Sequence, residues 1–336
     1  MRQYTIKDIA LQLNLSPSTV SRALHKHPDI SDETRQKVLT VAKELEYQPN
    51  LFARGLKKNT SRIIGVIVPQ VKHFFFAAIM GGITDVAYKS GFAVMICQSN
   101  EKEERETINI QTLIAQRVSG MLVSLSQKTS STDHFQQVIK LNIPVVFFDR
   151  VPEDIEACSV VVNDYEGAFQ AVEHLIQRGY RRIAHLAGPK TLSIGISRLE
   201  GYRDALKKHG FAFKDELVVY GGMNEEDGVA GFFELKKRFQ TMPDAIFAVN
   251  DPVAIGLYTE LKENQYRIPQ DVALVGFSDN PIASLIDPPL TTVRQPAYDI
   301  GRCAANLLIK QIQKEDQVFK PEKIVLTTEL IVRKST

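Results

Sequence analysis

The sequence predicts a small all-α helix-turn-helix unit at its start, followed by a larger α/β body built from doubly wound parallel sheets. Two short amphipathic helical patterns joined by a break occupy Ile6–Leu24. From Arg62 onward, β-branched strand patterns alternate with helical patterns. The length of 336 residues also fits about two or three domains better than one.

The stretch from Ile6 to Leu24 has the pattern of two helices joined by a tight turn. The sequence Asn14-Leu15-Ser16 interrupts the helical spacing of apolar residues. Ser16 is suited to cap the second helix, and Pro17 fits its first position, where the missing N–H is no loss. The apolar positions expected to face inward are Ile6, Ile9, Ala10, Leu13, Val20, Ala23 and Leu24.

A polar stripe runs along the second helix at spacings of three and four residues. It consists of Ser18, Ser21, Arg22 and His25 and carries no carboxylate. Hydroxyls and a guanidinium suit a DNA major groove, which is lined by phosphates and base edges. On this pattern alone, a solvated helical hairpin without a nucleic-acid role remains the alternative.

A third helix is expected after Ser31, which can cap it, and before Pro49. The next segment, residues 50–59, is too short to be a stable helix alone. Its apolar side chains, Leu51, Phe52 and Leu56, would be exposed in a simple tether. Two interpretations stay open: a linker that packs on the body, or a segment that becomes helical only when a partner is present.

The body shows βαβα alternation, which implies parallel sheets covered on both faces. The pattern predicts about nine or ten strands over 270 residues, which is more than one open sheet usually carries. Two lobes that divide near residue 160 are therefore expected. Ligands of such sheets bind beyond the carboxyl ends of the strands, which predicts a cleft that closes on a small molecule. Strands are expected at 63–68, 93–97, 120–125, 144–148, 182–186, 217–220, 245–249 and 272–277, and helices at 76–89, 103–116, 133–141, 164–178, 198–209, 225–240 and 252–264.

Composition and charge narrow the class of protein. Residues 1–60 carry ten Lys or Arg and six Asp or Glu, whereas the remainder carries 31 and 33. A basic unit on a slightly acidic body fits a polyanionic partner at one end only. No signal peptide or membrane span is apparent. The cysteines, Cys97, Cys158 and Cys303, are scattered and odd in number, which favours reduced core residues in a cytoplasmic protein.

A search for catalytic and cofactor motifs finds little. There is no GxSxG, HExxH, CxxC or P-loop, and no GxGxxG follows the strand at 63–68. The seven histidines show no metal-ligand spacing. We therefore expect no catalytic residues, no metal and no cofactor, and an enzyme is disfavoured.

Polar residues gather directly after three expected strands, as Asp149-Arg150, Asn250-Asp251 and Ser278-Asp279-Asn280. Carboxylate, amide and guanidinium groups suit a hydroxyl-rich ligand such as a sugar, because every buried hydroxyl must be paired. Residues 74–76, three phenylalanines, would give an apolar wall. The alternative is that each polar group is a helix cap.

The whole chain, about residues 4–334, closely resembles the lactose-repressor (LacI/GalR) family of bacterial transcription regulators. The resemblance rests first on TIKDIALQLNLSPSTVSRAL and TRQKVLTVAKELEYQPNLFARGL. It rests further on RIIGVIVP, GYRDAL, AVNDPVAIG, ALVGFSDN, PPLTTVRQP and TTELIVR. In that family the body is like a periplasmic sugar-binding protein, and the chain crosses between the lobes three times.

The resemblance implies double-stranded operator DNA as a partner, read by two chains on a near-palindromic site. It implies a hinge at Asn50–Lys58 that folds on DNA, with Leu56 wedged into the minor groove. Base-reading positions fall on Pro17, Ser18 and Arg22. Phosphate or positioning contacts fall on Thr5, Ser16, Thr19, Ser21, Ser31 and Thr34.

The resemblance also implies a small-molecule effector in the interlobe cleft. Its contact positions fall on Phe75, Phe76, Asp149, Arg198 and Asn250. Many members have an aspartate where this chain has Ser278, so we expect that neighbouring Asp279 takes that role or that the ligand differs. A sugar is favoured, with a purine or another small acid left open.

The domain boundaries expected from pattern and resemblance are a headpiece at 1–48, a hinge at 49–61 and an effector-binding and dimerisation body at 62–336. Lobe 1 would comprise about 62–160 and 290–320, and lobe 2 about 161–289 and 321–336. The chain shows no heptad tail, so a homodimer is expected rather than a coiled-coil tetramer.

Two other functions are alternatives to a ligand-responsive transcriptional repressor. A solute-binding protein would need a signal peptide and no headpiece. An enzyme acting on a sugar or nucleoside would need a base or nucleophile in the cleft, and Asp149 is the only residue worth testing.

Overall fold

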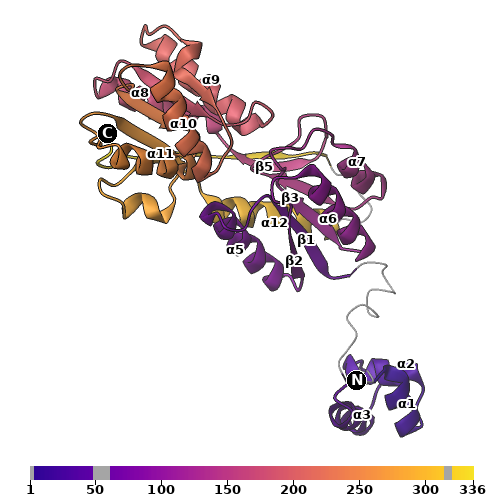
Figure 1. The fold of residues 1–336 in the computed structure, drawn as a ribbon. Coiled ribbons are helices and arrows are strands. Elements are labelled where there is room, and N and C mark those ends of the chain that lie inside the picture. Colours follow the sequence, from indigo (N-terminus) through magenta and orange to yellow (C-terminus); the bar gives the residue numbers. More distant parts are fainter. Residues whose placement is uncertain (1–3, 48–60, 314–319) are drawn as a thin grey trace. The chain divides into compact units, whose positions relative to one another are not determined.

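The computed structural model describes residues 4–47, 61–313 and 320–336. Its contacts divide the chain into two compact units, Met1–Ser61 and Arg62–Thr336. The expected hinge residues Asn50 and Leu56 lie outside the described residues. Each unit has helices of its own (Figure 1).

Between residues 4 and 47, the headpiece contains three helices, α1 (Ile6–Leu13), α2 (Pro17–Leu24) and α3 (Asp32–Glu44). Ser16 caps α2 by accepting a hydrogen bond from the Thr19 N–H, and Ser31 caps α3 through the Thr34 N–H. Both caps confirm the sequence prediction. The small core consists of Ile9, Ala10, Val20, Ala23, Val38, Val41 and Ala42.

The first lobe of the body is built on a six-stranded parallel sheet in the order β11-β5-β4-β3-β1-β2. Helices α5 (Phe74–Lys89) and α12 (Ala297–Gln313) pack on one face, and α6 (Glu103–Ala115) and α7 (Asp133–Lys140) on the other (Figure 1). The strands are β1 (Ile63–Val68), β2 (Ala93–Gln98), β3 (Gly120–Val123), β4 (Val145–Phe148), β5 (Cys158–Val162) and β11 (Lys323–Leu326).

The second lobe repeats this plan with a six-stranded sheet in the order β12-β10-β9-β8-β6-β7. All pairs are parallel except β10 with β12. The strands are β6 (Ile183–Ala187), β7 (Val218–Tyr220), β8 (Ala245–Ala248), β9 (Ala273–Ser278), β10 (Thr291–Arg294) and β12 (Glu329–Ile331). The helices are α8 (Asp164–Gln177), α9 (Ser193–Lys208), α10 (Glu225–Arg238) and α11 (Asp251–Glu263), with short 3₁₀ turns η1 (Asp215–Leu217) and η2 (Pro281–Ser284).

The chain passes between the two sheets three times, from β5 to α8, from β10 to α12 and from β11 to β12. These crossings correct the expected lobe boundaries. Strand β5 stays in the first sheet as far as Val162, β10 pairs with β9 in the second sheet, and β11 pairs with β5 in the first. The sheet to which a strand belongs depends on its pairing with strands that are distant in sequence. The local sequence of these short strands does not predict that pairing.

Helices α5, α8 and α9 are each followed by a glycine directly after the C-cap residue. Gly91, Gly179 and Gly210 have φ values of +74°, +100° and +76°, the left-handed conformation that ends a helix. One helix start differs from the sequence prediction. Helix α9 begins at Ser193, so Arg198 lies in its second turn rather than at its opening.

A fully buried histidine, His185, sits in the core of the second lobe between the rings of Tyr202 and Phe247. Its Nδ1 lies 2.9 Å from the Phe247 carbonyl oxygen, and its Nε2 has no hydrogen-bond partner among the described residues. A second ring proton would have no acceptor. Burial therefore lowers the pKa of His185 to about 4.

This pKa predicts that His185 makes the protein less stable as the pH falls from about 6.5 to 4. In that pH window the unfolded chain binds a proton at His185 that the folded chain excludes. The free energy of unfolding is therefore lower by about 3 kcal/mol at pH 4. Asp149 and Asp251, whose pKa values burial raises to about 6, act in the opposite direction. Urea unfolding at pH 4–7 should therefore show that the free energy of unfolding falls less steeply with decreasing pH in His185→Phe than in the parent chain. The same pH dependence in both proteins would contradict this prediction.

Candidate functional site

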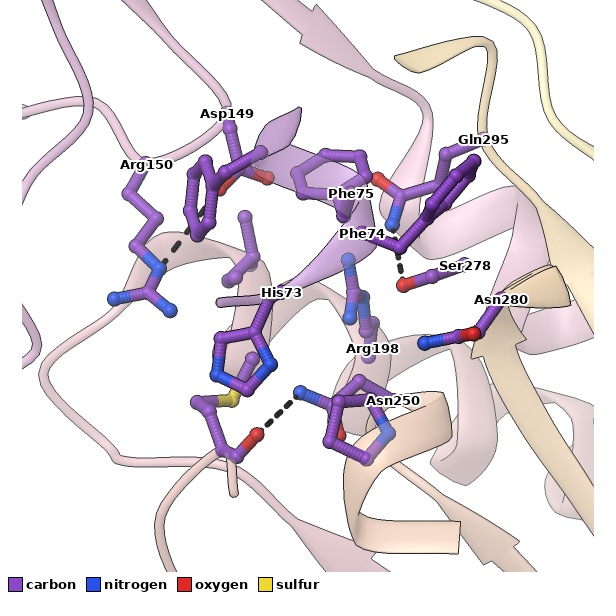
Figure 2. A pocket seen from close by; sticks show the side chains of 14 residues that line it. His73, Phe74, Phe75, Asp149, Arg150, Arg198, Asn250, Ser278, Asn280 and Gln295 are labelled. Atoms are coloured by element: carbon purple, nitrogen blue, oxygen red, sulfur yellow. Dashed lines mark hydrogen bonds and ion pairs between the residues drawn. The ribbon is translucent and has the colours of Figure 1, made fainter. Parts of the chain in front are cut away.

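A cleft lies between the lobes, at the carboxyl ends of strands from both sheets, and spans about 550 Å³ when the space open to solvent is included (Figure 2). Each lobe contributes side chains to it. From the first lobe come the start of α5 and the end of β4, as His73, Phe74, Phe75, Phe76, Asp149 and Arg150. From the second lobe and the crossover after β10 come Ile194, Arg198, Met223, Asn250, Pro252, Ser278, Asn280 and Gln295.

Arg198 is the largest buried polar side chain of the cleft, with 1% of its surface exposed. Its Nε and one terminal nitrogen donate to Asp164 Oδ1 over 2.8 and 2.7 Å, and the other terminal nitrogen donates to the Val249 carbonyl over 2.6 Å. The guanidinium carbon lies 3.8 Å from the centre of the Phe277 ring. Three of its five N–H donors are thus engaged, and two remain for a ligand.

Asp149 lies at the end of β4 and is 6% exposed. Its hydrogen bond to Ser124 Oγ is long, at 3.5 Å, and the Arg150 Nε is 3.8 Å away. Burial raises the pKa of Asp149 to about 6, and nearby Asp164 adds to the rise, whereas the Arg150 and Arg198 charges oppose it. The carboxylate therefore has acceptor capacity to offer to ligand hydroxyls.

The positive charges of the cleft are matched inside the protein. Arg150 donates to both carboxylate oxygens of Glu101 over 2.9 and 2.8 Å, and both side chains are buried. Arg198 is matched by Asp164 in the same way. The remaining lining group with a full charge is Asp149, so the cleft favours an uncharged ligand over an anionic one.

Asn250 is both a helix cap and a lining residue. Its Nδ2 donates to the Met223 carbonyl (Figure 2), and its Oδ1 accepts from the Val253 N–H at the start of α11, each over 2.9 Å. The cap alternative raised by the sequence is thus realised here. Asp251, by contrast, is fully buried and accepts from Thr292 Oγ1 and the Asn280 N–H, each over 2.6 Å.

The expectation for Asp279 is corrected by the structure. Its carboxylate is held by Arg294 Nε at 2.8 Å and by an Arg333 terminal nitrogen at 2.6 Å, and it does not line the cleft. The lining position belongs to Ser278, whose Oγ lies 3.0 Å from Gln295 Nε2 (Figure 2). This corner of the cleft is therefore neutral.

Five of the lining residues were not singled out by the sequence analysis: His73, Ile194, Met223, Pro252 and Gln295. Gln295 is 5% exposed, and its Oε1 is buried without a partner among the described residues. Gln295 lies on the crossover between β10 and α12. It follows none of the strands that the sequence predicted, so the search for polar residues after strands missed it. Gln295 is part of the family motif PPLTTVRQP, but the motif does not predict the direction of its side chain.

Hydrogen bonds and an ion pair join the lobes around the cleft. His73 Nε2 lies 3.1 Å from Asn224 Oδ1, and Lys72 Nζ lies 3.7 Å from Glu225 Oε2. Thr191 Oγ1 donates to the Gln127 carbonyl over 3.1 Å. These polar contacts link the two lobes directly across the space between them.

In the headpiece, the predicted DNA contacts gather at helix starts. Thr5, Ser16 and Ser31 precede α1, α2 and α3, where free N–H groups favour anions such as phosphate. Pro17, Ser18 and Arg22 are exposed on α2, and no ion pair or hydrogen bond engages the Arg22 guanidinium within the described headpiece. The remaining predicted contacts, Thr19, Ser21 and Thr34, are half-buried.

Residues 4–47, 61–313 and 320–336 contain neither a metal-binding cluster nor a membrane-spanning helix. No group of three or more His, Cys, Asp or Glu side chains there could hold a metal ion. None of the helices in the same ranges is long and apolar enough to cross a membrane. Cys97, Cys158 and Cys303 are free thiols, and Cys158 is buried.

Known proteins match both units. Residues 5–50 match bacterial regulatory proteins of the lacI family, and residues 172–336 match the periplasmic binding protein-like domain. The ribose operon repressor of Halalkalibacterium halodurans is 35% identical over 99% of this chain and 97% of its own.

Two solved structures extend the match to the fold. The transcriptional regulator CelR in complex with cellobiose is 31% identical, with a TM-score of 0.75 over 99% of this chain and 100% of its own. The lac repressor dimer bound to operator and an anti-inducer is 26% identical, with a TM-score of 0.85 over 99% of both chains. This chain belongs to the lacI family of bacterial regulatory proteins, and it is a DNA-binding transcriptional regulator rather than an enzyme.

Proposed function

We propose that this protein is a cytoplasmic repressor that binds a near-palindromic operator as a homodimer and responds to an uncharged sugar in the interlobe cleft. The observation that carries the proposal is the cleft itself. It combines partly engaged polar groups with an apolar wall, and both lobes contribute to it. A ligand there contacts both lobes at once, so its binding free energy can depend on the angle between them.

The chemistry of the lining supports a hydroxyl-rich, neutral ligand. Arg198 keeps two N–H donors, Asp149 keeps acceptor capacity, and Gln295 has an unpartnered amide oxygen. Phe75 and Phe76 meet edge to face at 5.4 Å and offer an apolar surface to the C–H face of a sugar ring. A purine base would use the same wall but fewer of the polar groups.

The proposed effector contacts are Phe75, Phe76, Asp149, Arg198 and Asn250, joined by Ser278 and Gln295 in place of Asp279. The proposed DNA contacts are Thr5, Ser16, Pro17, Ser18, Thr19, Ser21, Arg22, Ser31, Thr34, Asn50 and Leu56. The proposed domains are the headpiece at 1–48, the hinge at 49–61 and the body from 62. Dimerisation is supported by the lac repressor neighbour, which is described as a dimer bound to operator.

In this proposal the effector acts by changing the lobe angle, and the lobe angle decides whether two hinge segments can pair on DNA. Linkage makes the effect reciprocal, with a coupling of about 1–3 kcal/mol. Sugars, sugar phosphates and nucleobases would be screened by thermal shift with the full chain. A true effector at 100 times its Kd should add about 2.7 kcal/mol of stability.

The decisive measurement is operator affinity with and without the effector found in that screen. The operator would be selected from random-sequence DNA with the full chain. A change in affinity of about fivefold or more, in either direction, supports the proposal and gives the sign of regulation. Unchanged affinity at saturating effector would refute the switch.

Arg22→Ala is expected to weaken operator binding by about 1–3 kcal/mol, because one guanidinium can read a guanine through two hydrogen bonds. The loss should be confined to the selected operator. Affinity for unrelated DNA, which rests on phosphate contacts, should change much less. Fluorescence anisotropy with both DNAs at one salt concentration measures the difference, and an equal loss on both would mean that Arg22 contacts only phosphate.

Effector affinity is expected to fall as the pH drops below about 6, because the Asp149 carboxylate must be ionised to accept hydrogen bonds. A group with this pKa predicts an affinity roughly tenfold lower at pH 5 than at pH 8. Asp149→Asn should bind more weakly and lose most of the pH dependence. This variant separates Asp149 from two other titratable groups, His73, which lines the cleft, and Asp164, which pairs with Arg198. A steep pH profile that survives in the variant would assign the titration to one of these two groups.

A further inference from the structure

One of the polar contacts that cross between the lobes beside the cleft joins His73 to Asn224. His73 Nε2 lies 3.1 Å from Asn224 Oδ1 in a half-buried position, so the ring nitrogen donates and the amide oxygen accepts. His73 directly precedes α5 in the first lobe, and Asn224 directly precedes α10 in the second. We call this pair of side chains the latch.

Two other crossing contacts are more exposed to water than the latch. The Lys72 and Glu225 side chains are 55% and 43% exposed and 3.7 Å apart, so solvent screens their attraction. The bond from Thr191 Oγ1 to the Gln127 carbonyl is exposed as well. A hydrogen bond is stronger where water is partly excluded, so the latch should contribute most among these three contacts.

Both latch residues adjoin groups that line the cleft. His73 lines the cleft itself, and the phenylalanine wall at the start of α5 follows it in the chain. Asn224 follows Met223, whose carbonyl accepts from Asn250 Nδ2 over 2.9 Å, and both Met223 and Asn250 line the cleft. The arrangement of the lobes that makes the latch therefore also brings the two walls of the cleft together.

The chain crossings between the lobes are covalent and survive a change of lobe angle, whereas the latch bond breaks when the lobes part. We call the arrangement in which the latch is made the closed arrangement. We propose that the latch favours the closed arrangement even without an effector, so that its strength sets effector affinity. One hydrogen bond changes such an equilibrium by about two- to tenfold. This inference rests on the proposed function, because it names residues that set the proposed lobe angle.

The first test follows lobe opening in the full chain without a ligand. The sequence contains no tryptophan, so Phe74→Trp gives a single fluorescent reporter in the cleft lining. Asn224→Ser in this background keeps a hydroxyl that can cap α10, but the shorter side chain cannot reach His73. This change should raise the acrylamide quenching constant of the reporter and move its emission to longer wavelength. Unchanged fluorescence would overturn the inference.

A double-mutant cycle with His73→Leu shows whether both residues act through one bond. The double variant should be quenched no more than Asn224→Ser alone, and additive effects would count against the latch. His73→Gln keeps a side-chain N–H donor and should restore the parent signal. The matched control is His174→Leu, which removes a half-buried histidine contact to Thr336 Oγ1 within the second lobe and should leave quenching unchanged.

The second test measures ligand binding by calorimetry on the full chain without the reporter. Ribose, glucose and cellobiose would be titrated into the parent and Asn224→Ser. The variant should bind the sugar that the parent binds about two- to tenfold more weakly, although Asn224 does not line the cleft in the described part of the chain. Equal affinities would overturn the inference alone. If none of the three sugars binds while the reporter responds as expected, the latch stands and the proposed sugar effector fails.

Discussion

Arg198→Ala is expected to destabilise the body by about 3–5 kcal/mol and to abolish effector binding. The reason for the instability is Asp164, which is buried and ion-paired with Arg198 at 2.7 Å. Removing the guanidinium leaves an uncompensated buried carboxyl, which costs several kcal/mol, and also frees the Val249 carbonyl. Urea unfolding of the full chain at pH 7 measures the loss.

The matched control for this prediction removes the buried charge along with its partner. The pair Arg198→Met and Asp164→Leu should recover much of the stability, because replacing a buried ion pair with apolar groups is often close to neutral. Effector binding should stay absent in the double variant, since the free N–H donors of Arg198 are gone. Recovery of binding together with stability would show that Arg198 only supports the fold.

Arg198 also shows which features of the fold could be predicted from the sequence and which could not. Helix-capping residues such as Ser16 and Ser31 act within a few positions, and their roles were predicted correctly. Arg198 was expected at a helix opening, yet it lies in the second turn of α9, because α9 starts at Ser193 without a side-chain cap. Its partner, Asp164, is 34 residues away in the chain, and no local pattern links the two.

The candidate site was predictable as a location but not as a set of contacts. Placing polar groups after strands correctly brought Asp149, Asn250 and Ser278 to one cleft. It failed for Asp279, because Arg294 and Arg333 bind that carboxylate, which does not line the cleft. Which of two adjacent side chains faces a ligand depends on partners that are distant in sequence.

Close helix crossings are a further feature that the sequence patterns did not reveal. Helices α5 and α12 meet through Gly82 and Gly301, and α10 and α11 meet through Gly228 and Gly256. A Cβ atom at any of these four positions would lie less than 3.0 Å from a backbone oxygen of the partner helix. These glycines therefore serve close backbone approach within regular helices rather than chain turning.

The sharpest test of this packing compares two adjacent glycines of α5. Gly82→Ala would drive a Cβ into the Tyr298 carbonyl oxygen on α12, so the helices must separate, at a cost of about 1–3 kcal/mol or more. Gly81→Ala meets nothing closer than the Tyr298 ring at 3.8 Å, so alanine's better helix propensity should add up to about 1 kcal/mol. Urea unfolding of the two variants should move the midpoint in opposite directions. Equal effects on the midpoint would mean that α5 and α12 can move apart at little cost. That outcome would contradict the prediction, because Ile79 on α5 and Ile300 on α12 are buried in the same core and would be pulled apart.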